Sequence, residues 1–93
     1  MKPIVILPSF ERCVKKLNRR TKEQVAAALE KFNDFLVSGR LPAGLGFKKI
    51  NHDKYEFRID LRLRVILKED KDNFYLVLAG DHEDVKRYLR NFR

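Results

Sequence analysis

The clearest pattern in the chain is a regular alternation of apolar and charged residues across positions 55–68. Its apolar members are Tyr55, Phe57, Ile59, Leu61, Leu63, Val65 and Leu67. Successive side chains of a β-strand point to opposite faces, so this alternation predicts half-buried β structure with charged residues on the other face. The segment is long for a single strand, and we therefore expect a turn near Asp60 to Arg62.

The segments that follow predict a hairpin and a last helix. The polar run 69–73 indicates a hairpin turn, and the almost continuous apolar run 74–79 predicts a central strand that is covered on both faces and ends at Gly80. Asp81 is then a suitable N-cap for a helix. The apolar side of this helix consists of Val85, Tyr88, Leu89 and Phe92.

The N-terminal part of the chain predicts a short strand and a helix. Residues 4–7 form an apolar run that ends at Pro8, and Ser9 is the expected N-cap of the helix. We expect Asn18 to end this helix and residues 19–20 to lie in the link to the next one. Apolar residues recur at helical spacing at Phe10, Cys13, Val14 and Leu17.

A second and longer helix is predicted to follow. Thr21 and Gln24 form a capping-box pattern in front of an amphipathic segment that stops at Gly39. Residues 40–46 contain Pro and Gly and are typical of a loop, and residues 47–50 are expected to form a further short strand.

The predicted order of elements is a strand, two helices, a run of strands and a final helix. Strands that are grouped in hairpins after two helices favour an α+β fold with a mostly antiparallel sheet over alternating βαβ units. A chain of 93 residues has the size of one domain. We therefore expect residues 1–93 to form a single domain in which a helical hairpin precedes the sheet.

The chain is strongly basic. It has 21 Lys and Arg against 13 Asp and Glu, a formal net charge of +8 and a sequence pI of about 9.9. This excess of positive charge favours a polyanionic partner, and we take RNA as the expected one. The single Cys13 has no partner for an internal disulfide, and no apolar run approaches the roughly 20 residues of a membrane span. We expect a cytoplasmic protein with no signal peptide, no membrane partner and no cofactor.

The charged face of the alternating segment is the first candidate for function. Arg58, Arg62 and Arg64 are expected to project from the same side of the sheet. One guanidinium can donate two hydrogen bonds to one phosphate, so three of them would form a phosphate-binding surface. The alternative is that Arg58 and Arg64 form ion pairs with Glu56, Asp60 or cross-strand acids, as solvated sheet faces often do.

His82 is the second candidate. It lies at the predicted start of a helix, where backbone N–H groups can face an anion, and a histidine there could transfer a proton near neutral pH. The alternative is a helix-start residue bonded to Glu83 or Asp84. The two histidines and Cys13 show no metal-binding spacing, and Cys13 lies on the apolar side of its helix, away from any base. An enzyme with this sequence is therefore expected to work without a metal.

Three short motifs, in this order, resemble the RelE/ParE toxin superfamily of bacterial and archaeal toxin–antitoxin systems. The motifs are Y-x-x-R-x at Tyr55–Ile59, R-V-I-L at Arg64–Leu67 and G-x-H-x-D at Gly80–Asp84. The stretches Leu7–Phe10 and Leu45–Ile50 are similar as well, so the resemblance covers nearly the whole chain. It implies a small twisted antiparallel sheet packed against an N-terminal helical hairpin, with a C-terminal helix.

Many ribonucleases of this superfamily cut mRNA in the ribosomal A site and use the RNA's own 2′-OH as the nucleophile. The resemblance therefore implies a toxin that inhibits translation as a metal-independent, ribosome-dependent mRNA endonuclease and is held inactive by an acidic antitoxin. One branch of the superfamily instead poisons DNA gyrase without cutting RNA. A gyrase-directed toxin, or a non-catalytic module that binds nucleic acid or protein, therefore remains an alternative.

The resemblance also assigns roles by position. Arg64 would stabilise the charge that develops on the phosphate, His82 would act as general acid or base, and Tyr88 would be an auxiliary proton donor or stacking residue. Members with the G-x-H-x-D motif carry Tyr at the position of Lys86. In this chain the tyrosine lies two residues later, at Tyr88, so the role is carried over to a different position on the helix. Contacts with the RNA backbone are expected from Lys48, Lys49, Arg58, Arg62 and Arg87.

Overall fold

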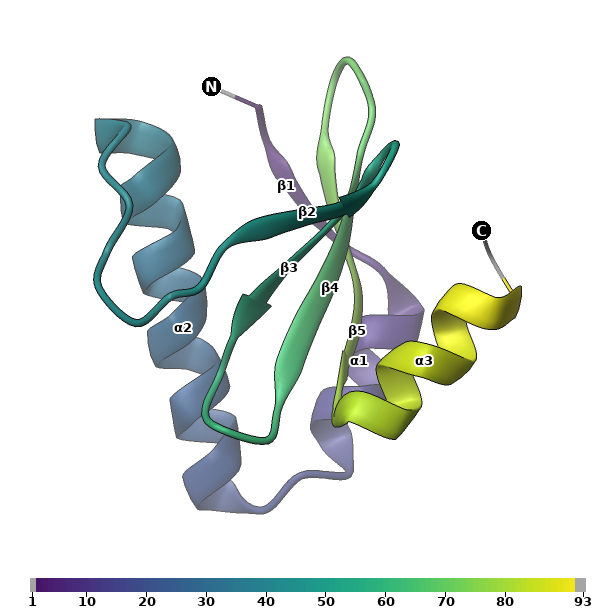
Figure 1. The fold of residues 1–93 in the computed structure, drawn as a ribbon. Helices are drawn as coiled ribbons and strands as arrows, with labels where there is room; N and C mark the ends of the chain where they lie inside the picture. Colours follow the sequence, from purple (N-terminus) through teal and green to yellow (C-terminus); the bar gives the residue numbers. More distant parts are fainter. Residues whose placement is uncertain (1, 92–93) are drawn as a thin grey trace.

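A computed structural model describes residues 2–91 of the protein. Figure 1 shows a twisted sheet with helices packed around it. The elements, in chain order, are β1 (Ile4–Ile6), α1 (Pro8–Lys15), α2 (Arg19–Ser38), β2 (Lys48–Asn51), β3 (Lys54–Arg58), β4 (Arg64–Glu69), β5 (Phe74–Gly80) and α3 (His82–Asn91).

The sheet is mixed but mostly antiparallel. Its strand order is β1-β5-β4-β3-β2, in which β1 is parallel to β5 and the other neighbours are antiparallel. The α+β fold with an N-terminal helical hairpin and a C-terminal helix is therefore confirmed. The predicted turn separates β3 from β4, and β5, the predicted central strand, lies between β1 and β4. Strand β2 begins one residue later than expected, at Lys48.

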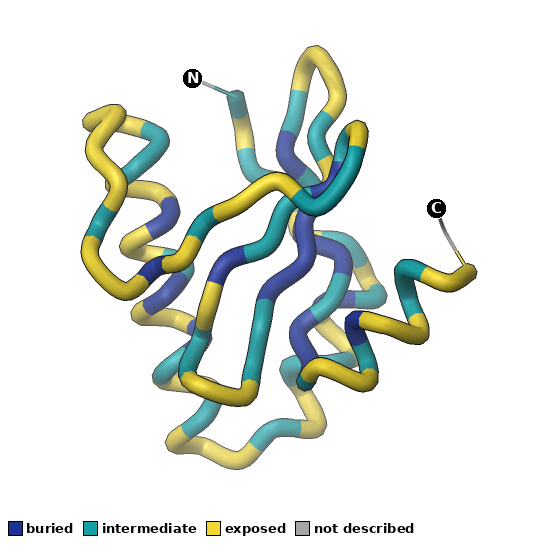
Figure 2. Tube along the Cα trace, viewed as in Figure 1, coloured by how far each residue is buried: buried dark blue, intermediate teal, exposed yellow. Residues whose placement is uncertain are grey.

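The helices cover the two faces of the sheet unequally. α1 and α2 lie against one face, and α3 contacts β4 and β5 from the other (Figure 1). Buried positions gather in the middle strands and along the sheet-facing side of α2 (Figure 2). Three buried apolar residues lie outside the main hydrophobic cluster, namely Ile66, Val77 and Val85. Val85 belongs to α3, so this helix buries apolar surface separately from the main cluster. The alternation fails at Leu61, which is 90% exposed because it lies in the β3–β4 turn.

Phe32 lies at the centre of the main core. Its ring is fully buried and stacks on Phe57 at a centroid distance of 4.9 Å and on Phe47 at 5.6 Å. It also meets the edge of Phe74 at 5.6 Å, and Phe47 in turn stacks on Tyr55 at 5.2 Å. One side chain of α2 thus contacts residues of β3 and β5 and the residue that precedes β2.

The start of α1 differs from the prediction. The N-cap is Leu7, with Pro8 in the first helical turn, so Ser9 already lies inside the helix. Pro is favoured at this position because its missing N–H would have no helical partner there. The Ser9 hydroxyl instead donates a hydrogen bond of 2.7 Å to the carbonyl oxygen of Val77 and ties α1 to β5.

The start of α2 also differs, because two capping signals overlap in the sequence. Asn18, expected to end the first helix, caps the second: its Oδ1 accepts a hydrogen bond of 2.8 Å from the Thr21 N–H. Residues 19–20 are therefore helical, and Thr21 is not the cap. The predicted end is confirmed, since Gly39 adopts a left-handed φ of 74° that a residue with a Cβ would rarely adopt.

The description of α3 ends at Asn91, so the predicted helical position of Phe92 lies outside the described residues. Across residues 2–91, none of the helices combines the length and the hydropathy that a bilayer crossing requires.

We predict that Phe32→Ala lowers the free energy of unfolding by about 3–5 kcal/mol, because it removes a fully buried ring and leaves a cavity among three others. Val37→Ala is the matched control in the same helix, since Val37 is 66% exposed, and should change this free energy by less than about 0.5 kcal/mol. Urea unfolding measures both. Equal losses in the two variants would contradict the central role of Phe32.

Candidate functional site

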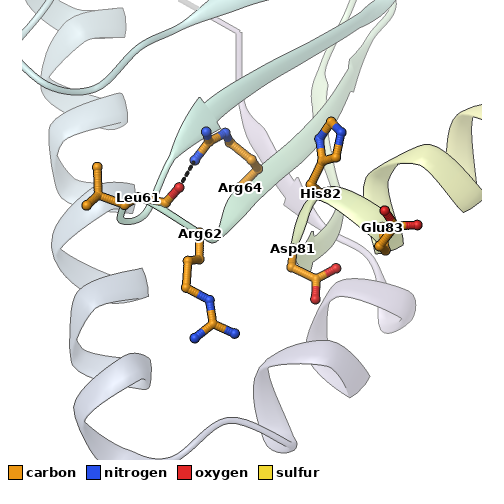
Figure 3. Close-up of a pocket in the computed structure, with 6 residues that line it drawn as sticks. All are labelled: Leu61, Arg62, Arg64, Asp81, His82 and Glu83. Atoms are coloured by element: carbon orange, nitrogen blue, oxygen red, sulfur yellow. Dashed lines mark hydrogen bonds between the residues drawn. The ribbon is translucent and has the colours of Figure 1, made fainter.

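A cleft of about 380 Å³ lies where β4 begins, β5 ends and α3 starts. Arg64 pairs in register with Gly80, which places Arg64 beside the first residues of α3. In Figure 3 the side chains of Arg64 and His82 extend to the same side of the strand ends. The residues that line the cleft are Leu61, Arg62, Arg64, Asp81, His82 and Glu83. The fold thus brings two of the three predicted catalytic residues together.

The G-x-H-x-D segment forms the α3 side of the cleft through two reciprocal hydrogen bonds. The Asp84 N–H donates to Asp81 Oδ1 at 2.9 Å, and the Asp81 N–H donates to Asp84 Oδ2 at 3.0 Å. These bonds confirm Asp81 as the N-cap, and the one from Asp84 is the main cause that holds the pKa of Asp81 below its usual range. A Cβ on Gly80 would lie 2.7 Å from Asp84 Oδ2, so only glycine leaves room for this carboxylate. His82 is thereby fixed as the exposed first residue of α3.

The β3–β4 turn forms the other side of the cleft. Asp60 Oδ1 accepts hydrogen bonds of 2.8 Å from the N–H groups of Arg62 and Leu63. The bond from Leu63 and then that from Arg62 hold the pKa of Asp60 below its usual range, against the opposing effect of burial. An aspartate that bonds its own backbone in this way stabilises a turn without Gly or Pro, which explains why the turn carries neither.

The guanidinium of Arg64 is held in place by the protein itself. Its Nη1 donates to the carbonyl oxygen of Asp60 at 2.9 Å and approaches that of Leu63 at 3.3 Å. It also approaches the carbonyl oxygen of Leu61 at 3.5 Å, the contact drawn in Figure 3. Its Nε lies 3.4 Å from Glu56 Oε2, with the two side chains 24% and 14% exposed. The ion pair with Glu56, one of the alternatives for this charged face, is therefore present. These partners occupy Nε and Nη1 and leave Nη2 as the nitrogen with which Arg64 can bind a ligand.

The expected row of three arginines on one sheet face is wrong. Arg58 and Arg64 are direct partners across β3 and β4 and share a face. Arg62 belongs to the turn, where the alternation no longer applies, and its side chain extends away from that of Arg64 (Figure 3). Arg58 lies against the loop, since a Cβ on Gly46 would come within 3.2 Å of its side chain.

The remaining predicted RNA-binding residues are dispersed. Lys48 pairs in register with Glu56, which shares the sheet face of Arg64, whereas Lys49 pairs with Tyr55 and lies on the opposite face. Lys49 Nζ is 5.9 Å from the centre of the Tyr55 ring. Arg87 Nη1 forms an exposed ion pair of 3.3 Å with Asp84 Oδ1.

Tyr88 lies apart from the cleft. It is near Lys54, the first residue of β3, and Asp53 just before it, at the opposite end of that strand from Arg58. Burial is the main cause that raises the pKa of the Tyr88 hydroxyl, while the Lys54 charge opposes this and the Asp53 charge adds to it. Lys54 is only 5% exposed, with its Nζ 3.2 Å from Asp53 Oδ1. The structure therefore divides the predicted catalytic set, with Arg64 and His82 in the cleft and Tyr88 beside a buried lysine.

Sequence reasoning missed the buried Lys54. Lys54 follows a polar turn, where a charged residue is normally solvated, so no local signal marks its burial. Within residues 2–91, no group of three or more His, Cys, Asp or Glu is arranged to hold a metal ion.

Solved toxin structures share this arrangement of elements. A chain of the RelB–RelE antitoxin–toxin complex from Methanococcus jannaschii superposes with a TM-score of 0.67 at 16% identity, covering 90% of this chain and 96% of that one. YafQ from Escherichia coli BL21(DE3) gives 0.68 at 16% identity and coverage of 91% and 98%. The YoeB dimer from Staphylococcus aureus gives 0.63 at 15% identity and coverage of 87% and 97%. No family model and no curated protein sequence matches the chain. At these identities the likeness is one of fold, and the RelE-like fold is confirmed.

We predict that Asp60→Ala lowers the free energy of unfolding at pH 7 by about 1 kcal/mol, because the two turn hydrogen bonds are lost. Because the pKa of Asp60 is lowered in the folded protein, its contribution is fully present above about pH 4 and is lost as the pH falls through that lowered value. The difference between the parent protein and the variant should therefore shrink in acid.

Urea unfolding at pH 7 and in acid measures this difference. Asp72→Ala, in the exposed β4–β5 turn, is the control and should change little at either pH. An Asp60→Ala effect that stays constant down to strongly acidic pH would contradict the role of the carboxylate.

Proposed function

We propose that this protein is the toxin of a type II toxin–antitoxin system and that it cleaves mRNA on the ribosome, without a metal, in the cytoplasm. The observation that carries the proposal is the cleft in which a RelE-like fold brings Arg64 and His82 together. A cation and an imidazole that can accept or donate a proton, close to one position, are parts that phosphodiester cleavage by a neighbouring 2′-OH can use.

In the proposed reaction, the 2′-oxygen attacks the adjacent phosphorus and the bond to the 5′-oxygen of the next nucleotide breaks. His82 accepts the 2′-OH proton or donates a proton to the departing 5′-oxygen, and the products are a 2′,3′-cyclic phosphate and a 5′-hydroxyl. Arg64 stabilises the charge on the phosphate oxygens through Nη2. Its guanidinium is already fixed by Glu56 and the turn carbonyls, so little reorganisation accompanies the reaction.

The position of Tyr88 favours dependence on the ribosome. With Tyr88 beside Lys54, His82 is the one histidine or tyrosine among the residues that line the cleft. We propose that the second proton-transfer group comes from outside the cleft, in preference to the exposed Glu83 carboxylate. Ribosomal RNA or ordered water can supply it, and in that case free RNA would be a poor substrate.

The proposed partners are mRNA, the ribosome and an acidic antitoxin. Lys48, Arg58 and Arg62 are exposed and contribute to the positive charge around the cleft. A protein with a net charge of +8 attracts both the RNA backbone and an acidic polypeptide. An antitoxin that covers these cations would compete directly with RNA for them.

A non-catalytic binding module is the second candidate, and two observations favour it. Glu56 already neutralises part of the Arg64 charge, and Tyr88 is remote from the cleft. A protein of this kind would bind RNA or its partner protein through the same face but would not cut RNA.

We predict that tightly regulated expression of the unmodified chain in a bacterial host arrests growth and produces codon-phased cuts in cellular mRNA. Arg64→Ala and His82→Ala should each relieve the arrest and reduce cleavage at least about 100-fold, since each removes charge stabilisation or proton transfer. His52→Ala is the matched control, because His52 is an exposed histidine in the β2–β3 turn. Growth curves and mapping of mRNA 5′ ends give the readout.

Full toxicity in both cleft variants would refute the assigned site. Arrest without mRNA cuts would favour a gyrase-directed toxin, and normal growth with folded protein would favour the binding module.

A further inference from the structure

The positive charge of the chain is concentrated in one short segment. Residues 12–22 contain six Lys and Arg and no Asp or Glu, in a chain whose formal net charge is +8. All six cationic residues are exposed in the structure. They are Arg12, Lys15, Lys16, Arg19, Arg20 and Lys22.

This segment, which we call the junction, spans the end of α1 and the start of α2 and lies at the same end of the molecule as the cleft (Figure 1). A depression of about 320 Å³ separates it from the β3–β4 turn, and Lys16, Thr21 and Arg62 are among its lining residues. Arg62 also lines the cleft, and Figure 3 shows its side chain extending away from Arg64. A cation is therefore placed between the cleft and the junction.

Acidic side chains do little to neutralise the junction. Among the described residues, one junction cation forms an ion pair: Arg19 Nε lies 3.6 Å from Glu23 Oε1. Its side chains are 94% and 70% exposed, and such pairs contribute little. Asp60 also lines the depression, but its Oδ1 accepts hydrogen bonds from two backbone N–H groups.

Helix stability does not explain the cations at the start of α2. The first turn of a helix favours negative side chains, because the N-terminal end of the helix dipole is positive. The first turn of α2 has no acidic residue and carries Arg19 and Arg20. Lys15 and Arg12, in the last turn of α1, do suit their helix end, so the unexplained charge is that of α2.

We propose that the junction is a second RNA-binding surface, which takes the sugar–phosphate backbone of the RNA beyond the part that lies in the cleft. The inference rests on the proposed function, and it gives the protein a longer RNA footprint than the cleft alone provides. A partner protein fits less well, because protein interfaces need apolar anchors. The apolar residues of the junction, Cys13, Val14 and Leu17, pack against the core instead.

The test compares two triple variants that lose the same charge. The junction variant carries Lys16→Gln, Arg20→Gln and Lys22→Gln, and the control carries Lys31→Gln, Arg40→Gln and Lys71→Gln at exposed positions elsewhere. The probe is a fluorescent 24-nucleotide 2′-O-methyl RNA, which lacks the hydroxyl needed for cleavage, and fluorescence anisotropy over a series of salt concentrations gives its affinity. All six substituted side chains are exposed, so both variants should keep the parent's thermal midpoint.

The junction variant should bind the RNA at least about tenfold more weakly than the control at low salt. Its slope of log affinity against log salt should fall by about 2, since each phosphate contact in a single strand contributes about 0.7. Equal losses in the two variants, or no loss in either, would overturn the inference. It would also be overturned if the junction variant lost affinity only for a poly-glutamate peptide, which would indicate an acidic protein partner.

The two proposals fail separately. RNA binding that depends on the junction, without mRNA cleavage on expression, would refute the nuclease and leave the junction standing. If the unmodified chain cleaves mRNA in cells but the junction variant binds RNA as tightly as the parent, only the inference about the junction is refuted.

Discussion

The stacking of Phe32 on the sheet is the interaction on which the rest of the structure depends. Through this one ring, α2 contacts Phe57 of β3, Phe74 of β5 and Phe47 at the entry to β2. Stacked and edge-on aromatic contacts are directional as well as apolar, so they fix the position of the helix on the sheet. α1 and α2 cover one face of the sheet and form the main hydrophobic core with it. The other face can therefore carry the charged residues Arg64 and Glu56 near α3 without loss of that core.

The cleft is then assembled by short-range hydrogen bonds at the ends of elements. Asp60 stabilises the turn whose carbonyl groups hold Arg64, and the Asp81–Asp84 pair fixes the start of α3 and therefore the position of His82. These acids bond backbone N–H groups, and those bonds hold the pKa values of Asp60 and Asp81 below their usual range, so both carboxylates keep their negative charge at neutral pH. The positive character of this end of the molecule therefore comes from the number of exposed cations around these aspartates and not from any loss of the aspartates' charge.

The strands and the turn were predictable, because a period of two residues and the continuous run 74–79 are direct signs of β structure. The errors have local causes. Asn18 and Thr21 are both plausible caps, and the choice depends on backbone geometry that the sequence does not express. The prediction that Arg62 shares a sheet face with Arg64 assumes that the alternation continues through the turn, where side chains no longer alternate between faces. The separation of Tyr88 from His82 was unpredictable because periodicity defines the face of a helix but not which strand end lies beneath it.

The distribution of charge adds a constraint that neither the core nor the cleft explains. A sequence selected for the stability of α2 alone would place acids in its first turn, whereas this chain places Arg19 and Arg20 there. Each such cation opposes the helix dipole, so its cost to the stability of α2 is offset by interactions elsewhere, among them the buried aromatic contacts of Phe32. A fold anchored through one buried ring can tolerate unfavourable charge at the far end of the same helix. The stability of the Phe32 contacts and the positive charge of the junction are thus two properties of one helix, and the first permits the second.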